Sequence, residues 1–414
     1  MSDLLARAVD VLVVGAGPAG LSAAMELARA GAGVVEVLDR EQRPGGIPRH
    51  SHHTGYGLRD LHRAMTGPAY ARRRTDLALE AGAWLRTGVT ATGWAGPLTL
   101  ETVSPGGLEL ITARAVVLAT GARERPRSAR LVPGSRPSGV YTTGQLQQAV
   151  YVHHQRVGTR AVVVGAEHVS FSAALTLQHG GVRVAAMVTD LPRQQSYLAF
   201  RVAAAARYRF PLLTGSALTR LLGHPRLEAV EVRRPDGRLE VIEADTVVFT
   251  GDWIPDHELA RRGALAIDPG TRGPSVDTAL RTSRPGVFAV GNLLRGVETA
   301  DVVALEGAAV SAQVLGHLSG AVPEPDVAVR AEHPLRWVAP NRVGPTGPPP
   351  PRGRFVVWST EFVARPVLEV RQGPRLLHRQ RSGLTLVPNR PVDVSARWGS
   401  RVDLDAGPVT VSLR

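Results

Sequence analysis

The 414-residue chain contains no cysteine. This absence excludes disulfides, a redox-active thiol pair, thiolate metal ligands and cysteine-held iron–sulfur clusters within the chain. Lysine is absent as well, so all 49 basic side chains are arginines. A Schiff-base lysine and a P-loop are therefore excluded too, because both chemistries need a lysine ammonium group.

Aromatic residues make up only 5% of the chain, although its formal net charge is +13. The arginines are scattered along the sequence, which argues against nucleic-acid binding; an anionic substrate, cofactor or partner protein explains the charge more simply. No run approaches the ~20 apolar residues that span a bilayer, and the N-terminus has no charged-then-apolar leader. We expect a soluble cytoplasmic protein with no membrane span.

An internal repeat is the strongest pattern that the sequence does contain. One copy runs from "VLVVGAGPAG" to "AVVLATGARERP", and the other from "AVVVGAEHVS" to "TVVFTGDWIP". Each has an apolar strand, a glycine turn, a helix, a return strand, a hairpin closed by Pro-Gly-Gly or Pro-Asp-Gly, and a strand that ends in Thr-Gly. This order predicts an α/β fold with two Rossmann-like dinucleotide-binding domains.

The sequence predicts four parts along the chain. A short strand over 287–290 and a long helix from about Ala300 would complete the first Rossmann unit, which makes that domain discontinuous. Pro- and Gly-rich sequence follows, and after it come short β-type runs separated by Gly and Pro. The expected parts are a first domain of residues 1–130 and 268–320, a second Rossmann domain of 131–267, a stiff linker of 321–354 and a small all-β domain of 355–414.

The first glycine turn has the spacing of an intact dinucleotide-binding site. Gly15 permits the tight turn, Gly17 lets the backbone approach a pyrophosphate, and Gly20 allows close packing of helix on strand. The phosphates then lie at the helix N-terminus. Asp39 ends the next strand about 20 residues on, where its carboxylate can accept hydrogen bonds from ribose hydroxyls.

Together with "GG" at 45–46, "ATG" at 119–121 and "VGN" at 290–292, this turn resembles the glutathione-reductase-like flavoproteins with two dinucleotide domains. The resemblance covers roughly residues 8–320 and implies FAD along the first unit, with the second unit placed for NAD(P)H. Asn292 stands where the family usually has an Asp that contacts the ribityl chain, and an Asn can still donate and accept there. A Rossmann unit without flavin and a nucleotide other than FAD remain alternatives. The cofactor-binding residues that the resemblance implies are Gly15, Gly17, Pro18, Ala19, Gly20, Asp39, Arg40, Gly46, Ile47, Val89, Ala119, Thr120, Gly121, Gly291, Asn292, Thr299 and Ala300.

The second glycine turn is altered where it would face a phosphate. Glu167 replaces the second glycine, and its bulk and negative charge both oppose a pyrophosphate. Ser170 replaces the third glycine and is small enough to keep the helix packed on the strand. Thr189 stands at the ribose-reading position with Asp190 beside it. We expect this unit to be a scaffold in which NAD(P)H binding is doubtful.

Histidines gather directly after the "GG" dipeptide, in "GGIPRHSHHTGYGLRDLH". His50 and His52 would share one side of an extended segment while His53 faces the other, and no carboxylate lies among them, so we expect no metal. A position beside the flavin or in a substrate channel is favoured for these three residues, since the preceding glycines lead toward the flavin ring in the resembled family. A surface or packing role, which would also suit His62, is the alternative.

A narrower resemblance rests on that stretch and on "VVLATGARERPR", "VVVGAEHVSFSAALTL" and "VGNLLRGVETADV". These motifs are similar to the α-type flavoprotein subunits of bacterial amine-oxidising complexes, a group that includes subunits of opine oxidase, hydrogen cyanide synthase and dye-linked L-proline dehydrogenase. The resemblance implies a partner flavoprotein of the D-amino-acid-oxidase type and, because this chain lacks Cys, a [2Fe–2S] protein on a separate polypeptide. The sequence identifies no catalytic acid or base.

The function implied is that of an FAD-dependent electron-transfer subunit of a dehydrogenase for amino acids, opines or related C–N compounds. A self-sufficient NAD(P)H-dependent FAD reductase and a non-catalytic nucleotide-holding subunit are the alternatives. The C-terminal β domain carries closely spaced arginines that have no evident task in FAD binding. We expect them to serve assembly with an acidic partner, a solubilising face being the alternative; they are Arg365, Arg371, Arg375, Arg379 and Arg381.

Overall fold

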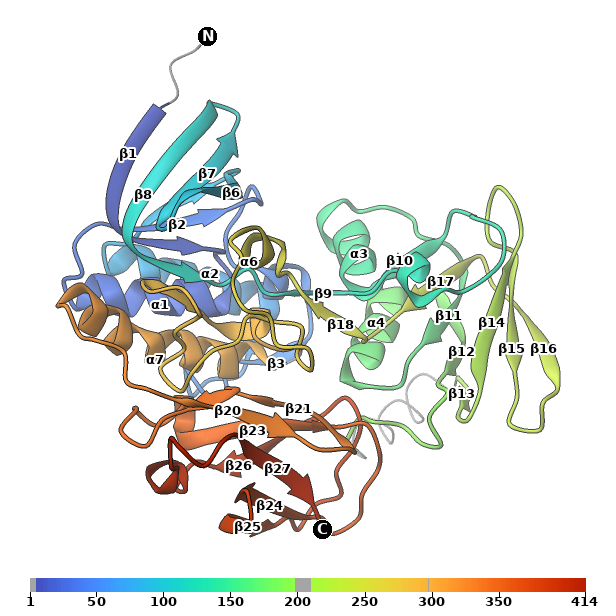
Figure 1. Cartoon of the computed structure of the whole chain (residues 1–414). Coiled ribbons are helices and arrows are strands. Elements are labelled where there is room, and N and C mark those ends of the chain that lie inside the picture. Colours follow the sequence, from blue (N-terminus) through green and yellow to red (C-terminus); the bar gives the residue numbers. More distant parts are fainter. Residues whose placement is uncertain (1–4, 198–209, 297) are drawn as a thin grey trace. The chain divides into compact units, whose positions relative to one another are not determined.

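The computed structural model describes residues 5–197, 210–296 and 298–414. The chain forms two units (Figure 1). One comprises Met1–Arg49, Thr54–Ala122 and Pro255–Arg414, and the other comprises His50–His53 and Arg123–Ile254. The chain crosses between them at β9 (Ala122–Glu124) and β18 (Trp253–Pro255), which pair with each other.

The first unit is built on a seven-stranded sheet in the order β5-β2-β1-β8-β7-β6, with β19 also paired to β8. Strands β5, β2, β1, β8 and β19 run parallel, whereas β6, β7 and β8 form an antiparallel meander. Their apolar residues are buried in one large core. The strands are β1 (Leu5–Val14), β2 (Val35–Asp39), β5 (Trp84–Thr87), β6 (Thr90–Gly96), β7 (Thr99–Ser104), β8 (Gly107–Leu118) and β19 (Val287–Ala289).

Two helices of this unit pack unusually closely. Helix α1 (Pro18–Arg29) follows β1, and helix α7 (Ala300–Leu318) follows β19. A Cβ atom at Gly307 would lie only 2.0 Å from the carbonyl oxygen of Ala19, so glycine is needed where the helices meet. This contact fixes the N-terminal turn of α1 against α7. Shorter elements complete the unit: β3 (Thr54–Tyr56), β4 (Met65–Thr66), α2 (Gly67–Glu80) and α6 (Glu258–Arg262).

The second unit repeats the same plan on a smaller scale. Its parallel sheet has the order β10-β17-β11-β12-β13, and β14, β15 and β16 form an antiparallel meander. Helix α4 (His168–His179) connects β11 to β12 as α1 connects β1 to β2. The elements are β10 (Val140–Thr142), α3 (Thr143–Gln147), a π-helical turn (Gln148–Val152), β11 (Arg160–Val164), β12 (Arg183–Val188), β13 (Leu212–Leu213), β14 (Ala217–Leu222), β15 (Ala229–Arg233), β16 (Leu239–Glu243) and β17 (Thr246–Phe249).

A β domain with its own core closes the chain inside the first unit. Its two sheets have the orders β22-β20-β27-β24-β25 and β21-β23-β26. Trp398 is fully buried in the core of this domain and stacks on Phe355. The strands are β20 (Val327–Ala331), β21 (Leu335–Ala339), β22 (Arg342–Val343), β23 (Arg354–Ser359), β24 (Val367–Gln372), β25 (Arg375–Arg381), β26 (Pro391–Ser395) and β27 (Val409–Leu413).

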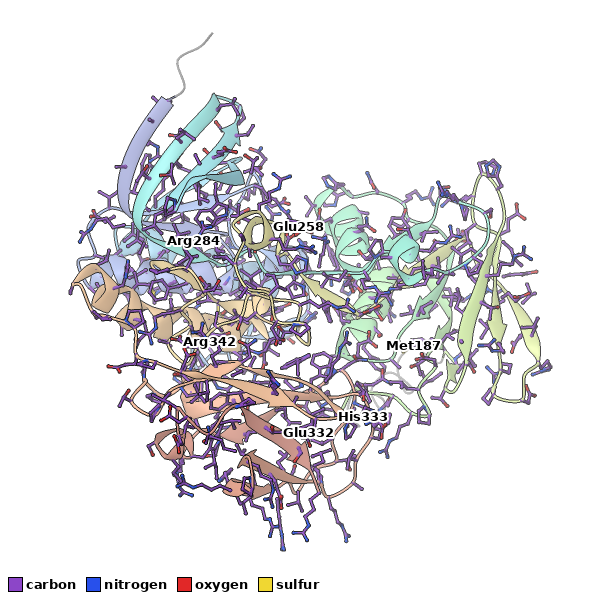
Figure 2. All side chains as sticks on the ribbon, viewed as in Figure 1. Met187, Glu258, Arg284, Glu332, His333 and Arg342 are labelled. Carbon is purple, nitrogen blue, oxygen red and sulfur yellow. The ribbon has the colours of Figure 1, made fainter. Side chains whose placement is uncertain are left out.

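The structure places three strands inside the segment 321–354, which was expected to be a Pro/Gly linker. Val329, Leu335 and Val338 are buried in the core of the β domain. Arg342, labelled in Figure 2, forms an ion pair with Asp326 at 2.7 Å across the start of this segment. The β domain therefore begins near residue 327, because prolines at the strand ends do not prevent the apolar residues between them from packing.

Among the described residues, no helix is both long enough and apolar enough to cross a membrane.

Candidate functional site

The turn between β1 and α1 needs two of its three glycines for the fold itself. Gly15 has φ +109°, and a Cβ there would lie 2.4 Å from the carbonyl oxygen of Ala119. At Gly20 a Cβ would lie 1.9 Å from the carbonyl oxygen of Gly15. At Gly17, by contrast, a Cβ would meet nothing within 4 Å. Gly17 therefore faces open space and leaves room for a group outside the chain.

The N-terminus of α1 is suited to an anion. Its N-cap Gly17 supplies no side-chain hydrogen bond, and no acidic residue stands in the first turn. The backbone N–H groups of Ala19 and Gly20 belong to the helix end that carries partial positive charge, since the first N–H groups of a helix have no partner within it. The open space at Gly17 and this helix end lie together, as a bound pyrophosphate requires.

Asp39 places a carboxylate beside the same turn. Its two oxygens accept hydrogen bonds from the backbone N–H groups of Ala16 at 2.7 Å and of Glu41 at 2.8 Å. Burial raises the pKa of Asp39 above its ordinary value, against the lowering effect of these two hydrogen bonds. Each carboxylate oxygen can accept more than one hydrogen bond, so ribose hydroxyls can still be bound.

The residues after β2 close in on the turn. Gly45 donates its N–H to the carbonyl oxygen of Ala16 at 2.8 Å. Gly46 has φ +62°, and a Cβ there would lie 2.9 Å from the Cα of Gly17. Ile47 begins a 3₁₀ turn and is half exposed. Only glycine at position 46 permits this approach of two backbone segments.

Five other residues expected at the site take part in contacts that hold its walls. Val89 donates its N–H to the carbonyl oxygen of Asp39 at 3.0 Å, and Ala119 donates its own to that of Val14 at 2.8 Å. The Thr120 hydroxyl donates to the carbonyl oxygen of Asp256 at 2.7 Å, while the N–H of Asp256 donates to the carbonyl oxygen of Gly121 at 2.8 Å. The Arg40 guanidinium lies 3.3 Å from the Asp256 carboxylate.

The loop before α7 reaches the same turn from the other side. Gly291 has φ +73°, and a Cβ there would lie 2.8 Å from the Cβ of Ala19. The Asn292 amide accepts the N–H of Glu298 at 2.8 Å and donates to the carbonyl oxygen of Glu298 at 3.3 Å. Asn292 thus fixes its own loop, and each of its polar atoms keeps one further hydrogen-bonding position. Thr299 is the N-cap of α7 and Ala300 its first residue.

Two charged contacts around the start of α7 were not anticipated from the sequence. The buried Asp301 carboxylate pairs with Arg59 at 3.1 Å. Asp60 pairs with Arg74 and accepts the hydroxyl of Tyr70, and that hydroxyl also lies 3.3 Å from the carbonyl oxygen of Ala300. The signal was present in the "GLRD" run, where adjacent opposite charges in a glycine-rich loop require specific partners.

These features fit FAD. The first unit combines an open glycine, an uncapped helix end, a carboxylate at the end of β2 and a second glycine-rich loop at the start of α7, all around one turn. Pyrophosphate, ribose and ribityl groups need this set of N–H donors and oxygen acceptors. The geometry therefore agrees with the prediction that the first unit binds flavin.

The second turn is filled by its own side chain. Glu167 is buried, and its carboxylate accepts hydrogen bonds from the Ala166 N–H at 2.8 Å and from the Thr250 hydroxyl at 3.0 Å. The Ser170 hydroxyl accepts the N–H of Glu167 at 3.2 Å and lies 2.7 Å from the Thr250 hydroxyl. Burial raises the pKa of Glu167 above its ordinary value. Thr189 is buried in this unit, whereas Asp190 is exposed.

A second buried carboxylate and an arginine line the same region. Burial raises the pKa of Glu124 to about 7, although the N–H of Gly144 donates to it at 3.0 Å. Arg130 donates to the carbonyl oxygens of Thr250 and Gly251 at 3.0 and 2.7 Å. The turn is therefore closed by residues of this unit alone.

The histidines do not form a metal site. His50 is buried, His53 is partly buried, and His62 is exposed with φ +51°. His52 stacks flat on Tyr151, with ring centroids 4.0 Å apart, and the Tyr151 hydroxyl lies 2.7 Å from Nδ1 of His179. Burial and, to a lesser degree, His179 lower the pKa of His52. Among the described residues, no group of three or more His, Asp or Glu side chains is arranged to hold a metal ion.

Comparison with known proteins agrees with this geometry. Residues 9–307 match the family model described as pyridine nucleotide-disulphide oxidoreductase. The chain is 36% identical over 181 residues to an opine oxidase subunit of Agrobacterium tumefaciens, covering 42% of this chain and 35% of that protein. It is 27% identical over 333 residues to the opine oxidase subunit of the same name from Rhizobium meliloti, covering 71% and 60% of the two chains.

The chain thus spans less than two thirds of either opine oxidase protein. It is also 29% identical over 294 residues to thioredoxin reductase of Mycolicibacterium smegmatis, covering 69% of this chain and 88% of that one. Among solved structures, thioredoxin reductase of T. acidophilum superposes with a TM-score of 0.62 at 22% identity, covering 74% and 98% of the two chains. L-proline dehydrogenase from P. horikoshii gives 0.58 at 18%, covering 77% and 57%. These two structures share the fold.

Proposed function

The chain belongs to the pyridine nucleotide-disulphide oxidoreductase family, and we propose that within it this chain is the FAD-containing electron-transfer subunit of a heteromeric dehydrogenase for amino acids, opines or related C–N compounds. Membership of this family makes the chain an FAD-dependent oxidoreductase. Its substrate class and its role in a complex are what we propose.

One contrast carries the proposal. The first dinucleotide turn is open at Gly17, and the second is filled by the carboxylate of Glu167. A pyrophosphate approaching the second turn would meet a buried acidic group that the fold already holds with two hydrogen bonds. Electrons from NADH or NADPH would need a coenzyme in that turn, so a different donor is favoured.

Bound FAD would take up and release two electrons. The residues of this chain bind and orient it: the helix end at Pro18, Ala19 and Gly20 receives the pyrophosphate, and Asp39 receives ribose hydroxyls. We assign the flavin side to the loop at Gly291 and Asn292 and to the start of α7 at Thr299 and Ala300. Arg59 and Asp60 keep that helix start in place through Asp301 and Tyr70.

The absence of cysteine argues against disulfide reduction by this chain, in spite of the family's description. A disulfide reductase of this family exchanges electrons with a thiol pair, and no such pair exists in this chain. The opine oxidase subunits are among the relatives whose names do not refer to disulfide chemistry. We therefore propose two partners: a flavoprotein of the D-amino-acid-oxidase type and a separate [2Fe–2S] protein that supplies the missing cysteines.

A self-sufficient NAD(P)H-dependent reductase is the second candidate. It is favoured by the family match and by the similarity to a thioredoxin reductase. In this case Glu167 would have to leave the turn when a coenzyme binds. A non-catalytic subunit that holds its nucleotide structurally is the third candidate.

Anaerobic stopped-flow spectrophotometry separates the three candidates. The purified chain is mixed with NADH, with NADPH, and with candidate amino acids or opines in the presence of the co-expressed partner flavoprotein, while the flavin absorbance is followed. Rapid bleaching only with substrate and partner supports the proposal. Rapid bleaching by NADPH alone overturns it in favour of the reductase, and a flavin that none of these donors reduces points to the non-catalytic subunit.

A further inference from the structure

The segment "PPPPRGR" at 348–354 forms one wall of a surface pocket of about 600 Å³ in the β domain. The opposite wall is the end of β26 and the residues that follow it. This volume lies within the range typical of small-molecule sites. The lining residues are Pro349, Arg352, Gly353, Arg354, Gln380, Asp393, Ser395, Ala396 and Arg397.

Positive charge dominates the pocket. Three guanidinium groups line it against a single carboxylate, that of Asp393. Asp393 pairs with Arg352 at 3.2 Å and with Arg354 at 2.5 Å. Among the described residues, the Arg397 guanidinium has no hydrogen-bond or ion-pair partner. The backbone N–H of Arg397 donates to the Ser395 hydroxyl. The pocket thus keeps an excess of unneutralised positive charge.

Backbone contacts join the two walls of the pocket. Arg352 has φ +61°, a left-handed conformation that is strained for a residue with a side chain. The carbonyl oxygen of Gly353 accepts the N–H of Ala396 at 3.1 Å, which joins the two walls. Arg354 lies opposite Ser395 in the β23–β26 pair. This pairing fixes the backbone from which Arg352, Arg354 and Arg397 extend.

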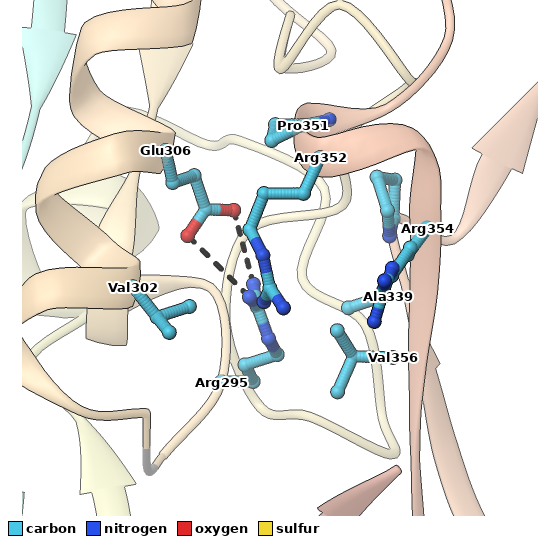
Figure 3. Close-up of a pocket in the computed structure, with 9 residues that line it drawn as sticks. Arg295, Val302, Glu306, Ala339, Pro351, Arg352, Arg354 and Val356 are labelled. Atoms are coloured by element: carbon cyan, nitrogen blue, oxygen red, sulfur yellow. Dashed lines mark hydrogen bonds and ion pairs between the residues drawn. The ribbon is translucent and has the colours of Figure 1, made fainter. Parts of the chain in front are cut away.

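The Arg352 side chain also lines a second, smaller cavity. It lines a cavity of about 10 Å³, large enough for one water, together with Arg295 and Glu306. Arg295 and Glu306 form a buried ion pair at 3.1 Å, and Figure 3 shows Arg352 extending toward this pair. The Arg352 side chain is only 27% exposed. The Arg352 side chain therefore lines both this small cavity and the surface pocket.

We propose that this pocket binds a small organic anion through its carboxylate or phosphate oxygens. A guanidinium group presents paired N–H donors that match two oxygens of such a group, and several together select for more than one anionic oxygen. The Arg397 guanidinium has no ion pair within the described residues, so it is available to the ligand alone. The guanidinium groups of Arg352 and Arg354 bind the ligand and also keep their ion pairs with Asp393.

The test uses the full chain and two probes, malonate and inorganic phosphate, with chloride at matched ionic strength as the reference. Binding is measured by isothermal titration calorimetry and by the ligand-dependent shift of the melting temperature. Arg397→Gln removes no ion pair of the fold and is expected to weaken binding about tenfold. Arg330→Gln, at an exposed arginine of the same domain outside the pocket, should bind as the wild type does.

Asp393→Asn provides a gain-of-binding arm, because it removes the competing carboxylate and should tighten binding several-fold. A response to malonate alone assigns a carboxylate ligand, and a response to phosphate alone assigns a phosphate ligand. The proposal is overturned if neither anion exceeds chloride, or if Arg397→Gln and Arg330→Gln bind equally well.

Discussion

The carboxylate of Glu167 lies 3.0 Å from the hydroxyl of Thr250. Thr250 directly follows β17 and is eighty-three residues beyond Glu167 in the chain. The Ala166 N–H holds the other carboxylate oxygen at 2.8 Å. These two contacts turn the side chain back over the β11–α4 turn, the place where an intact Rossmann unit receives a pyrophosphate. The second unit thus covers its helix end with an acidic group of its own.

Glu167→Gly should therefore improve the binding of NADH or NADPH, because it removes both the charge and the bulk from the turn. We expect the dissociation constant measured by titration calorimetry to fall at least about tenfold. Glu167→Gln, which removes the charge but keeps the bulk, should gain much less. Micromolar affinity of the wild-type chain for either coenzyme would contradict the expectation.

Glu124 should make the free energy of unfolding depend on pH. Its pKa is raised to about 7 by burial, whereas the unfolded chain has the ordinary value. Between roughly pH 4.5 and 7 the unfolded chain releases this proton while the folded chain retains it, so stability falls as pH rises. Glu124→Gln should reduce that fall by up to about 3 kcal/mol.

Denaturant unfolding at about pH 5 and about pH 7.5 measures this difference. Glu228→Gln, at an exposed position of the same unit, should leave the pH dependence as in the wild type. Glu298 also has a pKa raised to about 7 by burial, so part of the dependence should remain in Glu124→Gln. An unchanged pH profile in Glu124→Gln would show that Glu124 ionises normally in the folded chain.

The sequence was sufficient to predict both Rossmann turns, because glycine spacing and strand patterning are local properties. It also predicted that Glu167 opposes a phosphate, but it gave no indication of Thr250 as the partner, since that contact depends on how β17 joins the sheet. The proline and glycine content of the segment 321–354 predicts a linker, whereas its alternating apolar residues at 327–331 and 335–339 form strands. Composition averages over a segment, whereas packing depends on which side chains face the core.

The site could be predicted only in part for a similar reason. Gly17 and Asp39 stand in a recognisable order, so their places around the turn followed from spacing. The role of Asn292 was expected to be contact with the cofactor, yet the side chain also binds both backbone groups of Glu298. Pairs such as Arg59 and Asp301 join residues more than two hundred positions apart. The "GLRD" run indicates that Arg59 and Asp60 need partners, but a single sequence does not identify those partners.

Gly17→Val should abolish retention of FAD while leaving the fold intact. A Cβ at this position meets nothing within 4 Å, and the backbone is in the extended region, so valine is tolerated by the chain but occupies the space of the pyrophosphate. The flavin released on denaturation, measured per mole of protein, should fall at least about tenfold, with unchanged far-ultraviolet circular dichroism.

Gly20→Val is the contrasting variant. There a Cβ would lie 1.9 Å from the carbonyl oxygen of Gly15, so misfolding is expected as well as loss of flavin. A Gly17→Val protein that keeps its full complement of FAD would overturn the assignment of this turn.

The arginine-rich strands of the β domain should dock an acidic partner surface. Arg371 and Arg379 are already paired with Glu369 at 2.9 and 2.5 Å, which leaves Arg365, Arg375 and Arg381. Arg375 and Arg381 both lie on β25 and are the cations to test. The double variant Arg375→Glu, Arg381→Glu should weaken co-purification with the amine-oxidase-type partner, and raised salt should weaken it in the wild type by screening.

Surface variants suit this test better than deletion of the chain from about residue 340 onward, because strands β20, β21 and β22 contribute buried residues to the core of the domain. Arg183→Glu, at an exposed position on the second unit, serves as the matched charge reversal outside the β domain. Equal loss of partner in both variants, or no loss in either, would leave these arginines with a solubilising role only.

The filled turn at Glu167 also changes how the second unit depends on the cell's coenzyme supply. An ordinary nucleotide site gains stability by mass action, so its folded population rises and falls with the free concentration of its ligand. A carboxylate tethered beside its binding position is present at a local concentration that does not vary. If Glu167 excludes the coenzyme as we propose, the stability of the second unit should be the same at low and at high cellular concentrations of NADH and NADPH.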